Sequence, residues 1–285
     1  MAIKVFNLHL VSDSTGETVG LMARASVAQF EGAEPREYIW NMIRNQSQVA
    51  DCLEGIEAHP GFVLYTMVNH ELRQTLEDGC RKLKVPCIAV LDPVVANLGS
   101  YLETEVTGQP GRQHVMDAEY FDRIEAMHYV LAHDDGQLVH DLDEADILLF
   151  GVSRTSKTPT CMYLANRGLK AANIPVVPGV PIPPVVMQTS RPLKVGLTCD
   201  PRLLIDIRRN RLKLLRQDGE TAYVDPDAVK SEVRDAKRMF VRQGWPVIDV
   251  TRKSIEEVTA TILGHLNRHR AGLQGSTPAK RDGEG

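Results

Sequence analysis

The stretch from Gly151 to Thr158 holds the residue types and spacing best suited to chemistry. It matches the phosphate-binding pattern GxxxxGK[ST] except that Ser156 takes the place of the second glycine. Backbone N–H groups of such a loop and of the helix after it offer partial positive charge to a phosphate. The residues concerned are Gly151, Val152, Ser153, Arg154, Thr155, Ser156, Lys157 and Thr158.

Lys157 and Thr158 have the most specific expected roles in this loop. The lysine would reach a phosphate oxygen, and the threonine hydroxyl would hold Mg²⁺. The exchange at Ser156 bears on the loop geometry, because serine adopts positive φ less readily than glycine. The motif alone leaves a second interpretation open, an ordinary strand-to-helix turn with a solvated lysine.

The elements around the loop favour the phosphate site. The apolar run from Ile147 to Phe150 is short, and Asp146 and Gly151 bound it, which is typical of a strand covered on both faces. Pro159 suits the first turn of a helix, where a missing N–H costs nothing. A phosphate loop must follow a strand and open a helix, and the sequence predicts both.

Asp134 and Asp135 are the candidate acids, between His133 and Gly136. They could bind magnesium or accept the proton of an attacking hydroxyl, or of phosphate acting in reverse. An Asp-Asp-Gly run is also common at surface turns. Which of the two carboxylates would be the base is left open.

Two further positions follow predicted strands. Ser12 to Thr18 is a hydroxyl-rich segment that could bind an anion, although Ser14 and Glu17 also form a capping box that needs no ligand. Asp92 could be a metal-binding carboxylate at a strand end, but the proline after it favours a helix N-cap.

Several other polar groups receive structural interpretations. A helix-spaced basic run predicts a solvated helix face, and His265 with His269 predicts a solvated helix end. Ser254 and Glu257 form a second capping box, and Ile174 to Val177 predicts a strand. The basic run consists of Arg208, Arg209, Arg211, Lys213 and Arg216.

Strands that alternate with helices predict parallel sheets, and hence an α/β protein. We expect an open parallel α/β unit at residues 1–110 and a second α/β unit containing the phosphate loop at residues 111–271. Gly108 to Gln113 marks a turn or linker between them. The polar tail at residues 272–285 is expected to be disordered.

Composition restricts the class of protein. The 285 residues are 43% hydrophobic and 25% charged, typical of a soluble globular chain, and the net charge of −4 argues against nucleic-acid binding. The five scattered cysteines contain no CxxC pair and predict free thiols in a reducing cytosol. No segment approaches the length of a membrane span, so we expect a cytoplasmic protein without membrane contact.

Five segments together resemble a known family, the bifunctional regulatory proteins of pyruvate, phosphate dikinase and of phosphoenolpyruvate synthase. They occur in the family's order and cover the chain from about residue 9 to 260. The segments are His9 to Thr18, Leu131 to Gly136, Gly151 to Thr160, Lys170 to Pro175 and Gly196 to Pro201.

The resemblance implies a serine/threonine kinase that uses ADP as phosphoryl donor. It would modify a threonine close to the catalytic histidine of the dikinase or synthase and switch that enzyme off. It would also remove the phosphate with inorganic phosphate as acceptor, releasing pyrophosphate. The run from Ala171 to Pro181 looks more like the dikinase regulators, and a homodimer would suit such a target.

Two other readings are kept as alternatives, a small-molecule P-loop kinase that uses ATP and a non-catalytic nucleotide-sensing adaptor. The chain has no GxGxxGxV, HRD or DFG motif, so a protein-kinase fold is not expected.

Overall fold

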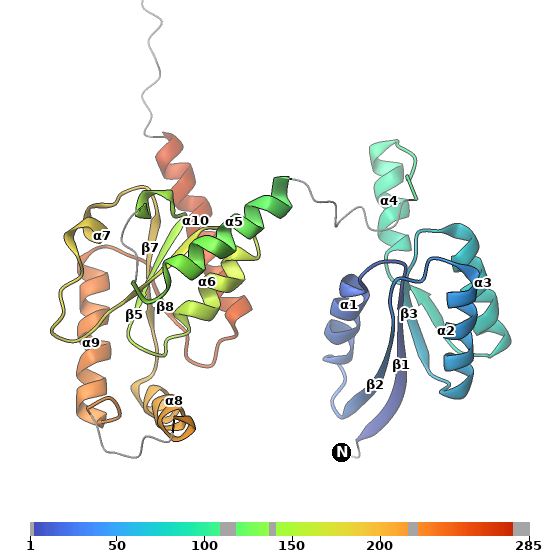
Figure 1. Cartoon of the computed structure of the whole chain (residues 1–285), viewed down its shortest axis with the longest axis horizontal. Coiled ribbons are helices and arrows are strands. Elements are labelled where there is room, and N and C mark those ends of the chain that lie inside the picture. The colour runs from blue at the N-terminus through green and yellow to red at the C-terminus, as the bar shows by residue number, and fades with distance from the viewer. Residues whose placement is uncertain (1–2, 109–117, 137–140, 216–221, 276–285) are drawn as a thin grey trace, which may run out of the picture. The chain divides into compact units, whose positions relative to one another are not determined.

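The computed structural model describes residues 3–108, 118–136, 141–215 and 222–275. The chain divides into two compact units, Met1–Val115 and Met116–Gly285. Each unit contains a four-stranded sheet whose strand pairs are all parallel (Figure 1). The expected α/β class is therefore confirmed.

The first unit has the strand order β2-β1-β3-β4. β1 lies between β2 and β3, and His9 pairs with Tyr38 on one side and with Val63 on the other. The strands are β1 (Lys4–Ser12), β2 (Ala33–Trp40), β3 (Phe62–Thr66) and β4 (Cys87–Ala89). The helices are α1 (Glu17–Val27), α2 (Gln46–Ala58), α3 (His70–Lys82) and α4 (Asp92–Leu102).

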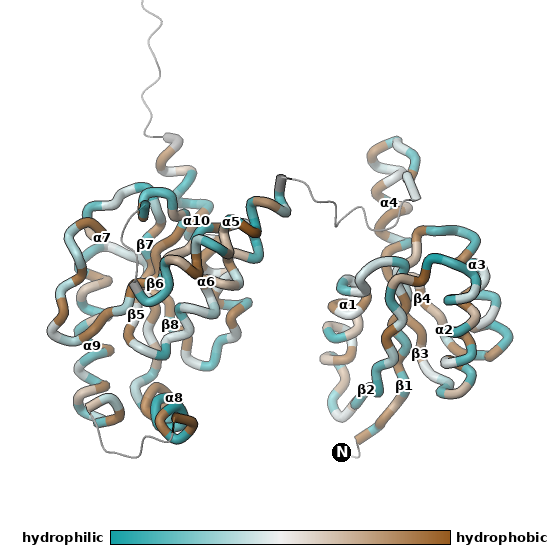
Figure 2. The backbone as a smooth tube through the Cα atoms, in the orientation of Figure 1, coloured by the Kyte–Doolittle hydropathy of each residue, from teal (hydrophilic) through white to brown (hydrophobic). Residues whose placement is uncertain are grey.

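Alternating side chains of β1 enter two separate hydrophobic clusters, as expected for a strand between two layers. Val11 packs in a cluster with residues of α2 and α3, whereas Leu8 and Leu10 pack with Val19 and Ala23 of α1. Figure 2 shows hydrophobic stretches along these strands and hydrophilic stretches on the outside of α2 and α3.

Two predicted helix starts in this unit are wrong. α1 begins at Glu17 after a left-handed Gly16 (φ 78°), and Ser14 does not cap it. The turn is held instead by a 3.1 Å hydrogen bond from the Ser14 N–H to the Ser12 hydroxyl. Asp92 is the first residue of α4 and not its N-cap, and its carboxylate pairs with the Arg73 guanidinium at 2.7 Å.

The second unit has the order β6-β5-β7-β8. Its strands are β5 (Ile147–Gly151), β6 (Ala171–Pro175), β7 (Leu193–Thr198) and β8 (Val247–Asp249). Its helices are α5 (Ala118–Ala132), α6 (Lys157–Ala165), α7 (Pro184–Gln188), α8 (Pro201–Leu214), α9 (Pro226–Arg242) and α10 (Ile255–Gly275), with short 3₁₀ turns η2 (Asp134–Gly136) and η3 (Leu142–Glu144).

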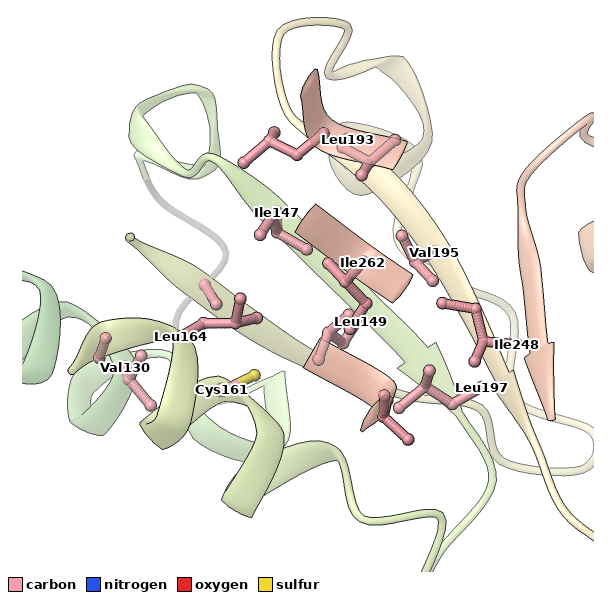
Figure 3. Close-up of a cluster of buried hydrophobic side chains, with 14 of the residues drawn as sticks. Val130, Ile147, Leu149, Cys161, Leu164, Leu193, Val195, Leu197, Ile248 and Ile262 are labelled. Atoms are coloured by element: carbon pink, nitrogen blue, oxygen red, sulfur yellow. The ribbon is translucent and has the colours of Figure 1, made fainter. Parts of the chain in front are cut away.

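β5 is buried along its whole length, as its unbroken apolar run predicts. Ile147 and Leu149 pack in one cluster with residues of α6 and α10, and Figure 3 shows them beside Leu164 and Ile262. Leu148 and Phe150 pack in the other cluster, with residues of α8 and α9. Helices on both faces thus hold rigid the strand that leads into the loop.

The C-terminal capping box is confirmed, because Ser254 and Glu257 exchange hydrogen bonds of 2.8 and 3.2 Å. α10 continues to Gly275 and so includes residues 272–275 of the expected tail. Residues 276–285, and residues 109–113 of the expected linker, lie outside the described residues.

Candidate functional site

The Gly151 to Thr158 loop lies at the point where the second sheet changes its direction of winding. From β5 the chain passes through α6 to β6 on one side, and it then returns to β7 on the other side of β5. Open α/β sheets bind ligands at such switch points, beyond the carboxyl ends of the strands. The predicted strand, loop and helix are confirmed, with Pro159 as the third residue of α6.

The backbone of the loop contains two left-handed residues, Arg154 (φ 73°) and Ser156 (φ 59°). Ser156 therefore adopts the positive φ that the second glycine of the pattern would supply. It is also the N-cap of α6, and its side chain makes no capping bond to the described residues. The Ser156 side chain therefore does not occupy the first N–H groups of α6. An anion site at a helix N-terminus requires such uncapped N–H groups.

Position 151 needs glycine because other atoms lie too close for a side chain, and not because of its φ angle. A Cβ atom at this position would come within 2.5 Å of the Thr155 hydroxyl oxygen and 3.0 Å of the Leu197 carbonyl oxygen. The first glycine of the motif thus lets the loop fold back tightly on the end of β5.

The Lys157 side chain folds back along the loop and is only 6% exposed. Its ammonium donates a 3.0 Å hydrogen bond to the Val152 carbonyl, which also accepts the Thr155 hydroxyl at 2.9 Å. Burial lowers the pKa of Lys157 to about 8, although the nearby Asp135 and Asp134 carboxylates oppose that shift. The Lys157 ammonium therefore loses its proton at a lower pH than an exposed lysine does.

Thr158 and Asp134 meet at the start of α6. The Thr158 hydroxyl donates a 2.9 Å hydrogen bond to Asp134 Oδ1. The structure thus brings together the predicted metal-binding hydroxyl and one of the predicted acids. Asp134 and Asp135 lie in the η2 turn, between α5 and β5 in the chain, and the hydrogen bond to Thr158 places this turn beside the loop.

Asn173 of β6 is the functional candidate that sequence reasoning missed. Its amide nitrogen lies 2.7 Å from Asp134 Oδ1, 3.1 Å from Asp135 Oδ1 and 3.0 Å from the Thr158 hydroxyl. Asn173 is 1% exposed, and its Oδ1 atom has no hydrogen-bond partner within the described part of the chain. The predicted strand began one residue later, at Ile174, so the only signal was its place in the Lys170 to Pro175 segment.

The two acids are held differently. Asp134 Oδ1 accepts hydrogen bonds from both Thr158 and Asn173, whereas Asp135 accepts only the longer bond from Asn173 among the described contacts. Asp135 also has a left-handed backbone (φ 49°) and an exposed side chain. Asp134 is therefore fixed in place by two donors, whereas the exposed Asp135 carboxylate is the more accessible of the two to a substrate hydroxyl.

His133 holds the turn that carries these acids. Its ring stacks on Tyr129 with centroids 3.9 Å apart, and Nδ1 lies 2.9 Å from the Tyr129 carbonyl. Its own carbonyl accepts the Asn173 N–H at 3.2 Å. His133 is therefore tied into α5 and β6.

Arg208 of the basic run is buried, so the prediction of a solvated face is wrong at this residue. It is 1% exposed, and it donates a 3.1 Å hydrogen bond to the Ser153 carbonyl within the loop. Arg209, Arg211 and Lys213 are exposed, as predicted. Arg216 lies outside the described residues.

The candidate segment from Ser12 to Thr18 belongs to the other unit. Asp13 accepts the Val68 N–H at 2.7 Å, and the Ser12 hydroxyl accepts the Thr66 hydroxyl at 3.1 Å. Its turn resembles the Gly151 to Thr158 loop, since a left-handed residue precedes the helix in both, but the helix opens with Glu17 where α6 opens with Lys157.

The remaining sequence candidates are structural. His269 lies 3.0 Å from the Arg191 carbonyl, and His265 lies 3.2 Å from the Arg268 side chain. Across the described ranges, no three His, Cys, Asp or Glu side chains are grouped so as to hold a metal ion. The cysteines are all free thiols, as predicted. Among the helices that the structure describes, none is long and apolar enough to cross a membrane.

The fold and the loop define an α/β protein with a strand, loop and helix of the form used for phosphate binding. The chain belongs to the kinase/pyrophosphorylase family, whose sequence model matches residues 8–263. The family resemblance drawn from the five motifs is therefore confirmed.

Three relatives carry the name "Putative pyruvate, phosphate dikinase regulatory protein". One from Paramagnetospirillum magneticum is 56% identical over 267 residues, covering 94% of this chain and 86% of the relative. One from Rhodospirillum rubrum is 52% identical and covers 93% and 97%. One from Erythrobacter litoralis is 48% identical and covers 97% and 100%.

Proposed function

We propose that this protein regulates pyruvate, phosphate dikinase by reversible phosphorylation of a threonine close to its catalytic histidine. In the inactivating direction the β-phosphoryl group of ADP passes to the threonine hydroxyl, giving phosphothreonine and AMP. In the activating direction inorganic phosphate takes the group back, giving pyrophosphate and free threonine. The family and the names of the relatives support this regulatory role.

The observation that carries the proposal is the convergence of Lys157, Thr158, Asp134 and Asp135 at one switch point. Phosphoryl transfer needs positioning and charge neutralisation more than covalent groups. Lys157 and the loop N–H groups would bind the phosphate oxygens. In the proposed pose, a phosphate replaces the Val152 carbonyl as the partner of the Lys157 ammonium.

The oxygen-rich cluster fits Mg²⁺, which prefers oxygen ligands and shares them with substrate phosphates. Thr158 and Asp134 would hold the ion, and Asn173 Oδ1, which has no hydrogen-bond partner among the described residues, is a further oxygen beside them. Magnesium would supply charge neutralisation on the transferred group. The protein's own contribution is to fix the hydroxyl and the carboxylate in one place.

Asp135 is the base in the proposed mechanism. It would accept the proton of the threonine hydroxyl in the forward direction and the proton of hydrogen phosphate in reverse. Asp134 is better suited to a fixed role, because two donors already hold it.

One anion site would serve both directions, because the terminal phosphate of ADP, inorganic phosphate and pyrophosphate are similar guests. Inorganic phosphate should therefore compete with ADP for the loop. Independent binding of the two ligands would count against a shared site.

The test is transfer from β-labelled ADP and magnesium to histidine-phosphorylated pyruvate, phosphate dikinase. Label on a target threonine, absent with ATP and with Lys157→Ala, is the expected result. Label on phosphoenolpyruvate synthase alone would keep the mechanism and change the partner. No transfer to either enzyme would overturn the proposal. Turnover of a metabolite with ATP would then favour the small-molecule kinase. Nucleotide binding without any phosphoryl transfer would favour the adaptor.

A further inference from the structure

A buried ion pair lies directly behind the phosphate loop. Arg208 of α8 and Glu232 of α9 form two hydrogen bonds of 2.8 and 3.0 Å, and their side chains are 1% and 12% exposed. Removing two charges from water offsets much of their attraction, so such a pair is weak evidence for stability alone. Its other contacts indicate what it does.

The guanidinium uses its remaining terminal N–H groups on two backbone carbonyls. It donates to the Ser153 carbonyl at 3.1 Å and to the Tyr223 carbonyl at 3.1 Å. The Tyr223 ring lies against the guanidinium, with 4.6 Å from Cζ to the ring centroid, and its hydroxyl lies 3.2 Å from the Ser153 hydroxyl. Ser153 is therefore held at its carbonyl by Arg208 and at its side chain by Tyr223.

The contact at Ser153 fixes the orientation of one whole peptide group. The Ser153 to Arg154 peptide is trans, so its C=O and N–H point in opposite directions. With the carbonyl held toward Arg208, the N–H of Arg154 must point away from Arg208. The left-handed φ of 73° at Arg154 is a conformation that a non-glycine residue keeps only when its surroundings impose it.

We propose that Arg208 is a positioning residue of the phosphate loop, which locks the Ser153 to Arg154 peptide so that the Arg154 N–H is presented to a bound phosphate. Glu232 orients the guanidinium and neutralises its charge, so Arg208 shapes the loop without being an anion ligand itself. This inference rests on the proposed function of the loop as a phosphate site.

Pyrophosphate binding to the full chain, measured by calorimetry, tests the proposal. Arg208 makes four hydrogen bonds to Glu232 and the two carbonyls, whereas a lysine ammonium has three N–H donors and methionine has none. Arg208→Lys and Arg208→Met should therefore each weaken pyrophosphate binding about tenfold or more, comparable to the loss of charge-assisted hydrogen bonds. Glu232→Gln keeps the shape of the partner and should weaken binding less, by about threefold to tenfold. It provides a second measurement if the Arg208 variants fold poorly.

Phe240→Leu is the matched control for lost stability. Phe240 is fully buried on α9, the helix that carries Glu232, and its ring packs on Gly196 of β7. This variant should unfold earlier and bind pyrophosphate as the wild type does. A change in pyrophosphate affinity that merely follows stability across all variants would overturn the positioning role.

Wild-type pyrophosphate affinity in both Arg208 variants would overturn the inference. Pyrophosphate binding by a wild-type chain that never transfers a phosphoryl group would contradict the proposed function alone, whereas no pyrophosphate binding would contradict both.

Discussion

The Thr158 hydroxyl donates its hydrogen bond to Asp134, and so joins the first turn of α6 to the η2 turn at a distance of 2.9 Å. Asn173 contacts both partners from β6. The proposed metal-binding hydroxyl and the proposed acids are therefore prearranged by one network that spans three separate segments of the chain.

Thr158→Val should weaken magnesium-dependent ADP binding about tenfold, equivalent to about 1.4 kcal/mol. Valine keeps the shape of the side chain but removes the oxygen. Thr158→Ser is the control, because it retains the hydroxyl and should bind ADP within about threefold of wild type. Equal binding by the valine variant and the wild type with magnesium would contradict a role of Thr158 at the metal.

Asp135→Asn should lower the transfer rate constant kcat by about 10²- to 10⁴-fold, the usual contribution of a general base. Its ADP affinity should change little, since in the proposed mechanism Asp135 acts as the base and does not hold the metal ion. Asp134→Asn should instead weaken magnesium-dependent ADP binding. Asp143→Asn, in η3 of the same unit, is the control. The reverse pattern for the two acids would exchange their assigned roles.

Phosphate affinity should fall as the pH rises through about 8, because the pKa of Lys157 is lowered to about 8 and only the ammonium attracts an anion. Binding near this pH should also take up protons, which calorimetry in buffers of different ionisation enthalpy can measure. The stability effect has the opposite sign. Between pH 8 and the ordinary value of 10.5, the unfolded chain holds a proton that the folded chain releases, so Lys157 contributes increasing stability with pH.

Ser156→Gly should stabilise the protein by about 0.5 to 1 kcal/mol, because glycine adopts left-handed φ without the steric cost that serine pays. The Ser156 side chain makes no capping bond to the described residues, so little is lost with it. Ser156→Ala retains the Cβ atom and should show no gain. Chemical denaturation of the wild type, Ser156→Gly and Ser156→Ala measures the three stabilities. Equal stability of the glycine and alanine variants would rule out relief of backbone strain as the cause.

The strands and the loop were predictable because each is encoded locally. The apolar run from Ile147 to Phe150 predicts a doubly covered strand, and the eight-residue motif predicts the turn that follows it. The same local rules failed at Ser14, since a tight turn uses its backbone for other bonds before α1 begins.

The contacts that complete the site come from distant parts of the chain. Asn173 is 39 residues from Asp134, and Arg208 is 55 residues from Ser153. Arg208 lies in a run of basic residues that a sequence pattern cannot separate into buried and exposed members. Only the packing of α8 against α9 turns one arginine inward.

The turn after β1 and the turn after β5 differ at one position that bears on the number of nucleotides we expect the chain to bind. Both follow a central strand and place a left-handed residue before a helix whose second residue is threonine, Thr18 or Thr158. The residue between them is Glu17 in one turn and Lys157 in the other. An acidic side chain at that position repels a polyphosphate, so a titration of this chain with ADP should saturate at one nucleotide per molecule.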